Sequence, residues 1–394
     1  MANAGLVARG AHRRGSETSN VRQLRVAVDA APARRDPTGV GVYVRDLARA
    51  LVKLEPESVA LIGVRPDGPL AATAQAAAHR TWLAGGRHHR WLLHRARRDA
   101  DEVGGTLVHF TNAAAPLRRM HPYVLTIQDL SLFRHPEHHP SLRLAVAPFT
   151  AVAAKRADAI IVPSEATRAE LRRVLGIAGR RVVVVPHAAS DPDESPPDGA
   201  GDRAEARRAL GLGEDPYVLS VGTLEPRKNQ ARLVGAFDRL ADRHPSLRLV
   251  LVGGEGWRGE ALRHALRESS RRDRIHLAGY VPAVRLAALM SGAAVFAYVS
   301  LYEGFGLPIL DAMRAGIPVV TSAVSSMPEV AGGAAILVDP RDPEAIADGI
   351  ARALACPAEL IRAGHARACG RTWADVAGET WEVYRWAALA RDRL

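Results

Sequence analysis

Two carboxylates and a glycine-rich turn stand together in EGFGLPILDAMRAGIPVV, residues 303–320. Glu303 opens this segment and Asp311 follows eight positions later. Pro308 suits the first turn of a helix, because its fixed φ is helical and its missing N–H would lack a partner there anyway. The glycines before it let the backbone bend sharply and expose N–H groups at a helix N-terminus, where an anion is stabilised. We therefore expect both carboxylates to face one cleft, Glu303 from a loop and Asp311 from the opening turns of the helix.

A cationic turn occurs in VGTLEPRKN, residues 221–229, which ends a predicted strand and precedes an amphipathic helical stretch. Arg227 and Lys228 are expected where that helix begins, and positive charges at this end of a helix cost some tenths of a kcal/mol unless an anion is held there. A solvated basic turn is the plainer alternative. The turn follows the first strand of the second half of the chain, however, and α/β sheets bind ligands at the carboxyl ends of their strands. We therefore predict a phosphate site here.

Glycines also precede a helical run near the N-terminus, in TGVGVYVRDL at 38–47. Lacking Cβ atoms, Gly39 and Gly41 let the backbone come close to a bound phosphate or sugar. An ordinary strand-to-helix turn has the same composition, so this segment alone leaves both interpretations open.

Short apolar runs alternate with helical stretches along the chain, which predicts βαβ units and parallel sheets. The strand candidates are 24–29, 59–64, 107–110, 123–127, 159–162 and 182–185, then 217–221, 247–252, 275–277, 294–298, 319–321 and 335–338. Between the two series, residues 190–204 are rich in Pro, Asp and Gly, which indicates a linker. Two similar halves joined in this way predict two Rossmann-like domains with the ligand between them.

Four segments, taken in this order, resemble the retaining glycosyltransferase family 4. They are the glycine loop at 38–47, the cationic turn at 221–229, GYVP at 279–282, and 303–320, whose Glu, seven residues and Asp are similar to the family's Glu, seven residues and Glu. The resemblance covers roughly residues 24–390. It implies an α/β GT-B fold, in which two Rossmann-like domains with parallel sheets face a central cleft.

The resemblance also implies a division of the chain. The expected parts are a disordered tail at 1–22, an N-terminal acceptor domain at 23–189, a linker at 190–213, a C-terminal nucleotide-sugar donor domain at 214–371, and a C-terminal helix at 372–394 that crosses back to the N-terminal domain.

Site residues follow from the same resemblance. It assigns Lys228 to the donor diphosphate, Glu303 to the hydroxyls of the donor sugar, and Asp311 to the ribose. Many members carry an arginine directly after the glycine that matches Gly222; this chain has Thr223 there, and we expect Arg227 to supply the charge. Glu303, Lys228 and Arg227 are thus the expected catalytic residues. The expected donor-binding residues are Asp311, Gly304, Phe305, Gly306, Leu307, Gly222, Gly279, Tyr280, Val281, Gly39 and Gly41.

Two residues depart from the family pattern. Asp311 is one methylene shorter than glutamate, so a water bridge or a closer approach of the helix would be needed to reach the ribose. Gln128, in TIQDLSLF, stands where many relatives have histidine, and it can form hydrogen bonds but cannot exchange a proton near neutral pH. Gln128 and Asp129 are candidates for contact with the sugar. His187, just before the linker, suits a core or hinge role as well as a ligand contact.

No metal or other cofactor is expected, because cationic side chains and helix N-termini take over the neutralising role. Asp-x-Asp occurs at 99–101 and at 191–193, but neither copy ends a predicted strand, and we interpret both as solvent-facing charge. No Cys/His cluster has zinc spacing. The two cysteines, Cys356 and Cys369, are expected to be ordinary thiols in a reducing cytoplasm.

The net charge of +11 admits several partners. Basic clusters at 87–90 and 94–98 suit a solvated face, an anionic membrane surface or nucleic acid, but no nucleic-acid motif is present, so nucleic acid is not expected. No apolar run approaches the ~20 residues that span a bilayer. The expected location is cytoplasmic, with peripheral contact at the inner face of an anionic membrane as one alternative.

The expected function is transfer of a hexosyl group from a nucleotide-diphosphate sugar to a glycan or lipid-linked acceptor, with retention of configuration. The motifs are most similar to those of bacterial mannosyl- and rhamnosyltransferases of surface polysaccharides, which favours GDP-mannose over UDP-sugars and mannose as the transferred sugar. A sugar-nucleotide epimerase of the same fold and a non-catalytic protein that binds polyanions or membranes remain as alternatives. A phosphorylase would need a cofactor lysine, for which no motif is present.

Overall fold

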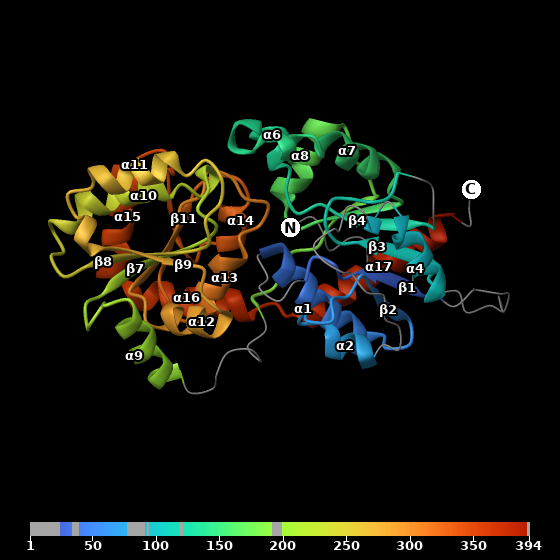
Figure 1. The fold of residues 1–394 in the computed structure, drawn as a ribbon, viewed down its shortest axis with the longest axis horizontal. Helices are drawn as coiled ribbons and strands as arrows, with labels where there is room; N and C mark the ends of the chain where they lie inside the picture. Colours follow the sequence, from blue (N-terminus) through green and yellow to red (C-terminus); the bar gives the residue numbers. More distant parts are fainter. Residues whose placement is uncertain are drawn as a thin grey trace.

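The computed structural model describes residues 24–33, 39–76, 91–92, 94–117, 121–190 and 199–391. The predictions for the tail at 1–22, the basic cluster at 87–90 and the Asp-x-Asp at 191–193 lie outside the described residues. Figure 1 shows two domains side by side, one blue to green and one yellow to orange. Each is built around its own parallel sheet.

The N-terminal domain contains six parallel strands in the order β2-β1-β3-β4-β5-β6. They are β1 (Val26–Asp29), β2 (Val59–Ile62), β3 (Leu107–Phe110), β4 (Tyr123–Thr126), β5 (Ala159–Val162) and β6 (Val182–Val184). The first five are buried along their whole length, because helices cover both faces of the sheet. Burial on both faces explains why these strands read as short, mostly apolar runs.

The C-terminal domain contains a second sheet of six parallel strands in the order β12-β11-β10-β7-β8-β9. They are β7 (Tyr217–Val221), β8 (Arg248–Val252), β9 (Ile275–Gly279), β10 (Val295–Tyr298), β11 (Val319–Ser322) and β12 (Ile336–Val338). The order reverses between β7 and β10, and ligands of doubly wound sheets bind beside such a switch point. The predicted α/β architecture with two parallel sheets is confirmed.

Helices pack around both sheets. Those of the N-terminal domain are α1 (Gly39–Leu54), α2 (Ala71–Ala76), α4 (Ala96–Glu102), α5 (Ser131–Arg134), α6 (Ser141–Leu144), α7 (Ala147–Arg156) and α8 (Glu165–Leu175). Those that follow in the chain are α9 (Gly199–Ala209), α10 (Gln230–Ala241), α11 (Glu260–Glu268), α12 (Ala283–Ser291), α13 (Leu307–Arg314), α14 (Met327–Ala331), α15 (Pro343–Ala355), α16 (Pro357–Cys369) and α17 (Trp373–Arg391).

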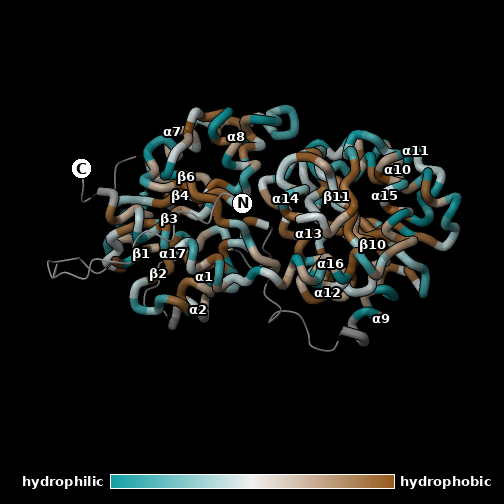
Figure 2. Tube along the Cα trace, turned by 180° about the vertical axis from the view of Figure 1, so that it is seen from behind, coloured by the Kyte–Doolittle hydropathy of each residue, from teal (hydrophilic) through white to brown (hydrophobic). Residues whose placement is uncertain are grey.

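The last helix, α17, lies in the N-terminal domain although it follows the C-terminal domain in the chain (Figure 1). It packs against α1 and contacts β4 and β5. Tyr384 of α17 is fully buried, and its hydroxyl is 2.6 Å from Nδ1 of His109 on β3. Figure 2 shows the hydrophobic colour concentrated along strands such as β10 and β11, which the helices surround.

The segment read as a linker from its composition is partly helical. Residues 199–209 form α9, which packs against α12 of the C-terminal domain. Ala206 is buried in this contact. The prolines and most of the aspartates that indicate a linker precede this stretch, whereas its alanines, arginines and glutamate favour a helix despite two glycines at its start.

In the first Asp-x-Asp, Asp101 faces solvent as predicted but Asp99 does not. Asp99 is 1% exposed and accepts a hydrogen bond from the indole N–H of Trp91 at 2.6 Å. The interpretation was wrong because the charged neighbours of Asp99 in the sequence lie on the other face of α4. The arginines of this helix each have a carboxylate one turn away, in the pairs Arg95–Asp99, Arg97–Asp101 and Arg98–Glu102. Within the described residues, no helix combines the length and the apolar character that a membrane span requires.

Candidate active site

The candidate site gathers where the strands of the C-terminal sheet end. β7 leads into a 3-10 turn, η3 (Pro226–Lys228), and β10 leads through the loop 299–306 into α13. The cationic turn precedes α10 instead of forming its first turn, because Asn229 takes a left-handed conformation with φ 64°. The Asn229 side chain holds this break by donating to the carbonyls of Val299 at 2.9 Å and Pro340 at 2.7 Å.

Glu303 lies between the two cations of this turn. Its Oε2 accepts from Nη1 of Arg227 at 2.7 Å, and its Oε1 accepts from Nζ of Lys228 at 2.6 Å. Glu303 is only 7% exposed. Burial opposes its ionisation, but Arg227 and Lys228 outweigh burial and lower the pKa of Glu303 to about 2. The three residues expected to be catalytic are therefore in direct contact, and Glu303 is an ionised carboxylate at neutral pH.

Two further residues complete the network, and neither was predicted. Tyr298, at the end of β10, donates to Oε1 of Glu303 at 2.9 Å and accepts from Lys228 at 2.9 Å. Burial and the Glu303 carboxylate hold the pKa of Tyr298 well above its ordinary value, so the hydroxyl keeps its proton. Glu225 accepts from Nη2 of Arg227 at 2.8 Å. A tyrosine that ends a strand five residues before the acidic motif is a sequence signal that could have found Tyr298.

Two glycines let the segments that follow the carboxyl ends of β7 and β8 approach each other beside Lys228. Gly222 has φ 154°, and a Cβ there would lie 3.4 Å from the Lys228 side chain. Gly253 has φ 155°, and a Cβ there would lie 2.0 Å from the Gly222 carbonyl oxygen. Gly222 was predicted and Gly253 was not, although a glycine pair directly after a predicted strand is a visible signal.

The glycine turn of the acidic motif forms the contact with the N-terminal domain. A Cβ on Gly304 would lie 1.7 Å from the Gln128 carbonyl oxygen. The Gly304 carbonyl accepts from Oγ of Ser164 at 2.8 Å and Oγ1 of Thr167 at 3.1 Å. Gly306 then starts α13 with φ 110°, and both Phe305 and Leu307 are buried. The predicted turn thus opens a helix, and Gly304 faces the other domain across the site.

Asp311 lies on α13 as predicted, but its carboxylate is bonded to the chain itself. It accepts from the backbone N of Ser190 at 2.8 Å and from the Ser190 hydroxyl at 3.0 Å. Burial raises the pKa of Asp311, and these two hydrogen bonds oppose the rise. Arg314, one turn later, donates to the Ser190 carbonyl. This face of α13 is therefore hydrogen-bonded to Ser190, in the segment that leaves the N-terminal domain.

Gln128 reaches the site from the end of β4 and is held by a buried histidine. Its Oε1 is 2.9 Å from Nε2 of His187, which is 2% exposed. Burial, with a smaller effect of Arg371, lowers the pKa of His187 to about 3, so the neutral ring donates from Nε2. The amide nitrogen of Gln128 is buried and has no partner among the described residues. The side-chain amide nitrogen of Gln128 is therefore unpaired, while its backbone carbonyl lies against Gly304.

The remaining predicted residues lie around this centre. Asp129 accepts from the backbone N of Ser131 at 2.8 Å, at the start of α5. Gly39 and Gly41 lie in the first turn of α1, and a Cβ on Gly39 would have no neighbour within 4 Å. Gly279 ends β9 with φ 64°, and its carbonyl accepts from Gly253 at 2.8 Å. It is followed by the half-exposed Tyr280 and the buried Val281.

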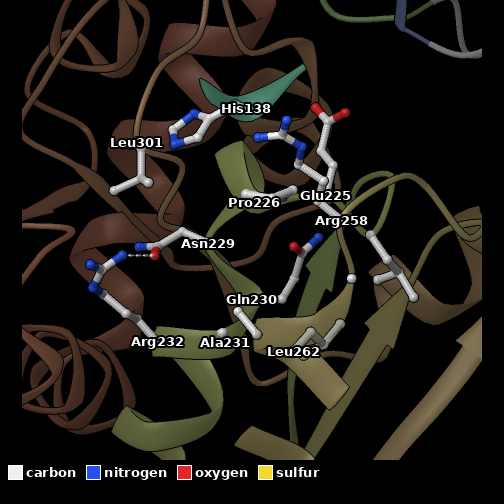
Figure 3. Close-up of a pocket in the computed structure, with 13 residues that line it drawn as sticks. His138, Glu225, Pro226, Asn229, Gln230, Ala231, Arg232, Arg258, Leu262 and Leu301 are labelled. Carbon is white, nitrogen blue, oxygen red and sulfur yellow. Dashed lines mark hydrogen bonds between the residues drawn. The ribbon is translucent and has the colours of Figure 1, made fainter. Parts of the chain in front are cut away.

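A pocket of about 200 Å³ lies beside the cationic turn and contains none of the predicted site residues. Figure 3 shows His138 of the N-terminal domain on one side, and Glu225, Asn229 and Arg258 of the C-terminal domain around it. Contacts between the domains flank it, because Trp257 donates to the His138 carbonyl and Arg258 donates to the Glu137 carbonyl.

A second bridge between the domains lies at the start of α8. The carboxylate of Glu329 on α14 accepts from the backbone N–H groups of Glu165 at 3.0 Å and Ala166 at 3.3 Å. A carboxylate at a helix N-terminus satisfies otherwise unpaired N–H groups and suits the helix dipole. The two domains are therefore held together on both sides of the Gly304 contact.

Comparison with known proteins identifies the family of this chain. Residues 37–190 match the family described as Glycosyltransferase Family 4, and residues 202–368 match Glycosyl transferases group 1. The O-antigen chain mannosyltransferase B of Escherichia coli is 31% identical over 385 residues, which cover 92% of this chain and 100% of that protein. This chain belongs to the glycosyltransferases of these two families. It is a hexosyltransferase with a GT-B fold, as predicted.

More distant relatives extend the comparison. The GDP-mannose-dependent alpha-(1-6)-phosphatidylinositol monomannoside mannosyltransferase of Mycobacterium tuberculosis is 31% identical over 59% of this chain and 60% of its own length. Sucrose-phosphate synthase from Thermosynechococcus elongatus superposes with a TM-score of 0.72 at 23% identity, covering 93% of this chain and 100% of the other. Anabaena HepE in complex with UDP and glucose superposes with a TM-score of 0.69 at 18% identity, over 91% and 98%. These two superpositions support the fold alone.

Proposed function

We propose that this protein transfers a mannosyl group from GDP-mannose to a glycan or lipid-linked acceptor, with retention of anomeric configuration. The observation that carries the proposal is the buried Glu303 carboxylate bonded to both Arg227 and Lys228 at the ends of β7 and β10. The printed names of two relatives support the sugar and the nucleotide, since one is an O-antigen mannosyltransferase and the other is GDP-mannose-dependent.

In the proposed reaction, the bond between the sugar C1 and the diphosphate oxygen breaks, and its electron pair leaves with the diphosphate. The oxygen of the acceptor hydroxyl forms the new bond to C1 on the same face of the sugar. Lys228 and Arg227 turn from Glu303 to the phosphate oxygens and stabilise the developing charge. Glu303 then accepts hydrogen bonds from the sugar hydroxyls. The departing diphosphate gains negative charge as the bond to C1 breaks, so it accepts the proton of the acceptor hydroxyl.

Gln128 has a positioning role in this scheme. His187 fixes the amide through Oε1, which directs the free N–H₂ donor towards a sugar hydroxyl at the Gly304 contact. Asp311 reaches the ribose only if it shares its carboxylate with Ser190 or gives up that contact. We propose that the nucleotide base binds at Gly279, Tyr280 and Val281, and that the glycine turn of α1 faces the transferred group.

We infer that transfer proceeds without a divalent metal. Glu303 and Glu225 are bonded to cationic side chains, which already provide the positive charge that a metal would bring to the diphosphate. Contact with an anionic membrane has no support from the described part of the basic cluster, because the arginines of α4 are paired with carboxylates.

The experiment is a thermal-shift series with GDP, UDP, ADP and a polyanion, followed by turnover of GDP-mannose and UDP-glucose in excess chelator with membrane glycolipid extract as acceptor. We expect stabilisation by GDP, release of GDP only with acceptor, and an α-linked product by NMR. Stabilisation by the polyanion alone would indicate a non-catalytic protein. Turnover of GDP-mannose without acceptor into another nucleotide sugar would indicate an epimerase.

A further inference from the structure

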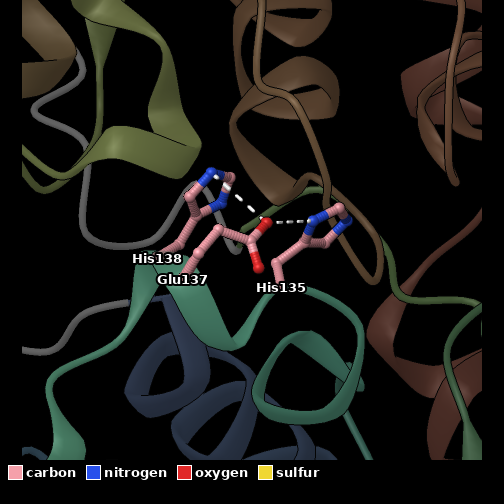
Figure 4. Close-up of side chains that lie close together, drawn as sticks. All are labelled: His135, Glu137 and His138. Atoms are coloured by element: carbon pink, nitrogen blue, oxygen red, sulfur yellow. Dashed lines mark hydrogen bonds and ion pairs between the residues drawn. The ribbon is translucent and has the colours of Figure 1, made fainter.

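Three potential metal ligands that are not part of the Glu303 network converge on one turn of the N-terminal domain. They come from His-Pro-Glu-His, residues 135–138, where η1 (Pro136–His138) follows α5. Nδ1 of His135 is 3.1 Å from Oε1 of Glu137, and Nε2 of His138 is 3.8 Å from the same oxygen. Figure 4 shows the two imidazoles on either side of the Glu137 carboxylate.

The spacing of these atoms suits a single ion. All three ligand atoms lie within 4.8 Å of one another. Ligand atoms about 2 Å from a tetrahedral zinc lie roughly 3.3 Å apart, so small side-chain rotations bring the set onto one ion. Two imidazoles and one carboxylate form the donor set that borderline ions such as Zn²⁺ prefer, whereas Mg²⁺ prefers oxygen ligands alone.

The turn is also anchored from the other domain. Trp257 and Arg258 donate to the carbonyls of His138 and Glu137, and the His135 ring lies 5.0 Å from the Tyr302 ring. These contacts hold the backbone of the turn near its position in the ion-free protein, and a bound ion would reinforce it. The imidazole Nδ1 of His138 is buried and has no hydrogen-bond partner in the described part of the chain.

We propose that His135, Glu137 and His138 bind a divalent transition-metal ion of the zinc class beside the contact between the domains. The ion takes no part in sugar transfer. It fixes the turn that receives Trp257 and Arg258, and so it stabilises the arrangement in which the two domains are in contact.

The test is titration of the full-length, chelator-treated protein with Zn²⁺ against a competing fluorescent indicator, together with the visible spectrum of the Co²⁺ form. We expect one ion per chain, a rise in Tm on adding zinc, and a Co²⁺ spectrum without a thiolate band. His135→Ala and Glu137→Gln should each weaken binding at least tenfold without lowering the Tm of the metal-free protein.

The matched control is Cys369→Ser, because Cys369 and His365 form another contact of ligating atoms, with Sγ 3.6 Å from Nε2. This variant should bind zinc as the wild type does. The proposal is overturned if the two cluster variants bind zinc unchanged, if Cys369→Ser abolishes binding, or if the wild type binds only in the high micromolar range. None of these outcomes bears on sugar transfer, which is measured in chelator.

Discussion

The Asp311 carboxylate accepts two hydrogen bonds from Ser190, one from its backbone N at 2.8 Å and one from its hydroxyl at 3.0 Å. The acidic position expected to hold the ribose is thus tied to the segment that leaves the N-terminal domain. A nucleotide that bonds to Asp311 must compete with Ser190, so donor binding and the path of this segment are coupled.

Asp311→Ala and Ser190→Ala separate ribose binding from this structural tie. If Asp311 binds the ribose, its replacement should raise the donor KM at least tenfold, about 1.4 kcal/mol, with a smaller change in kcat. Ser190→Ala removes only the hydroxyl contact and should leave KM within about threefold. Steady-state kinetics and Tm on both variants test this. Equal KM values for the two variants would mean that Asp311 acts only within the protein.

Lys228→Ala should weaken donor binding and slow transfer. It removes a charge-assisted contact worth about 1.5–3 kcal/mol, which corresponds to a loss in kcat/KM of roughly 10- to 150-fold. The matched control is Arg232→Ala, which removes an exposed cation four residues later that bonds only to Asn229 among the described contacts. Wild-type kinetics for Lys228→Ala would place the phosphate site elsewhere.

Tyr298→Phe deletes the hydroxyl that joins Lys228 to Glu303 and changes little else in volume. We expect kcat/KM to fall at least about tenfold, since a net hydrogen bond to a charged group contributes about 1.5 kcal/mol or more. Tyr302→Phe is the control, because its hydroxyl accepts only from the backbone of Leu130, at 3.2 Å, among the described residues. If both variants lose activity equally, Tyr298 has no particular role in the network.

Acidification should reveal the contribution of Glu303 to stability. Its pKa is depressed from 4.5 to about 2, so the stabilisation is present above about pH 4.5 and is lost as pH falls towards 2. A shift of this size corresponds to about 3 kcal/mol. Glu303→Gln should therefore show a smaller drop in Tm between pH 5 and pH 3 than the wild type does. Its kcat at neutral pH should fall by at least 100-fold, and parallel Tm curves with full turnover would contradict both expectations.

Gly304→Ala tests the contact between the domains. The added Cβ would overlap the Gln128 carbonyl, so the domains must separate there, and transfer should fall at least tenfold while each domain stays folded. Gly378→Ala, on α17 with no atom within 4 Å of the added Cβ, should behave as the wild type. Activity assays with circular dichroism check both variants, and an active Gly304→Ala would mean that this contact is dispensable.

Much of the fold could be predicted from local patterns. Strands such as β4 and β11 are buried on both faces, so they read as short apolar runs, and Gly306 with Pro308 predicts the start of α13. The rest depends on tertiary contacts that have no local signature. Asn229 adopts φ 64° because its side-chain amide donates hydrogen bonds to carbonyls 70 and 111 residues away in the sequence. Asp99 is buried beside Trp91, whose indole N–H donates to its carboxylate.

The sequence also predicted part of the candidate site and missed the rest. The acidic residue and the two cations belong to recognisable segments, and the structure brings them into contact. Tyr298, Gly253 and the tie between Asp311 and Ser190 were missed, because each depends on which strand ends and which helices become neighbours. His187 was open to several roles, and only the 2.9 Å distance to Gln128 distinguishes a positioning role from simple packing.

The bonds from Arg227 and Lys228 to Glu303 should also weaken the binding of anions other than the donor. Any phosphate that binds these cations must displace a carboxylate that belongs to the same chain and is therefore present at a very high effective concentration. Inorganic phosphate or a nucleoside monophosphate offers Glu303 nothing in exchange. If these cations bind the donor diphosphate as proposed, a sugar nucleotide supplies two phosphates for the cations and hydroxyls for the displaced carboxylate, and Glu303 as an intramolecular competitor would favour the complete donor.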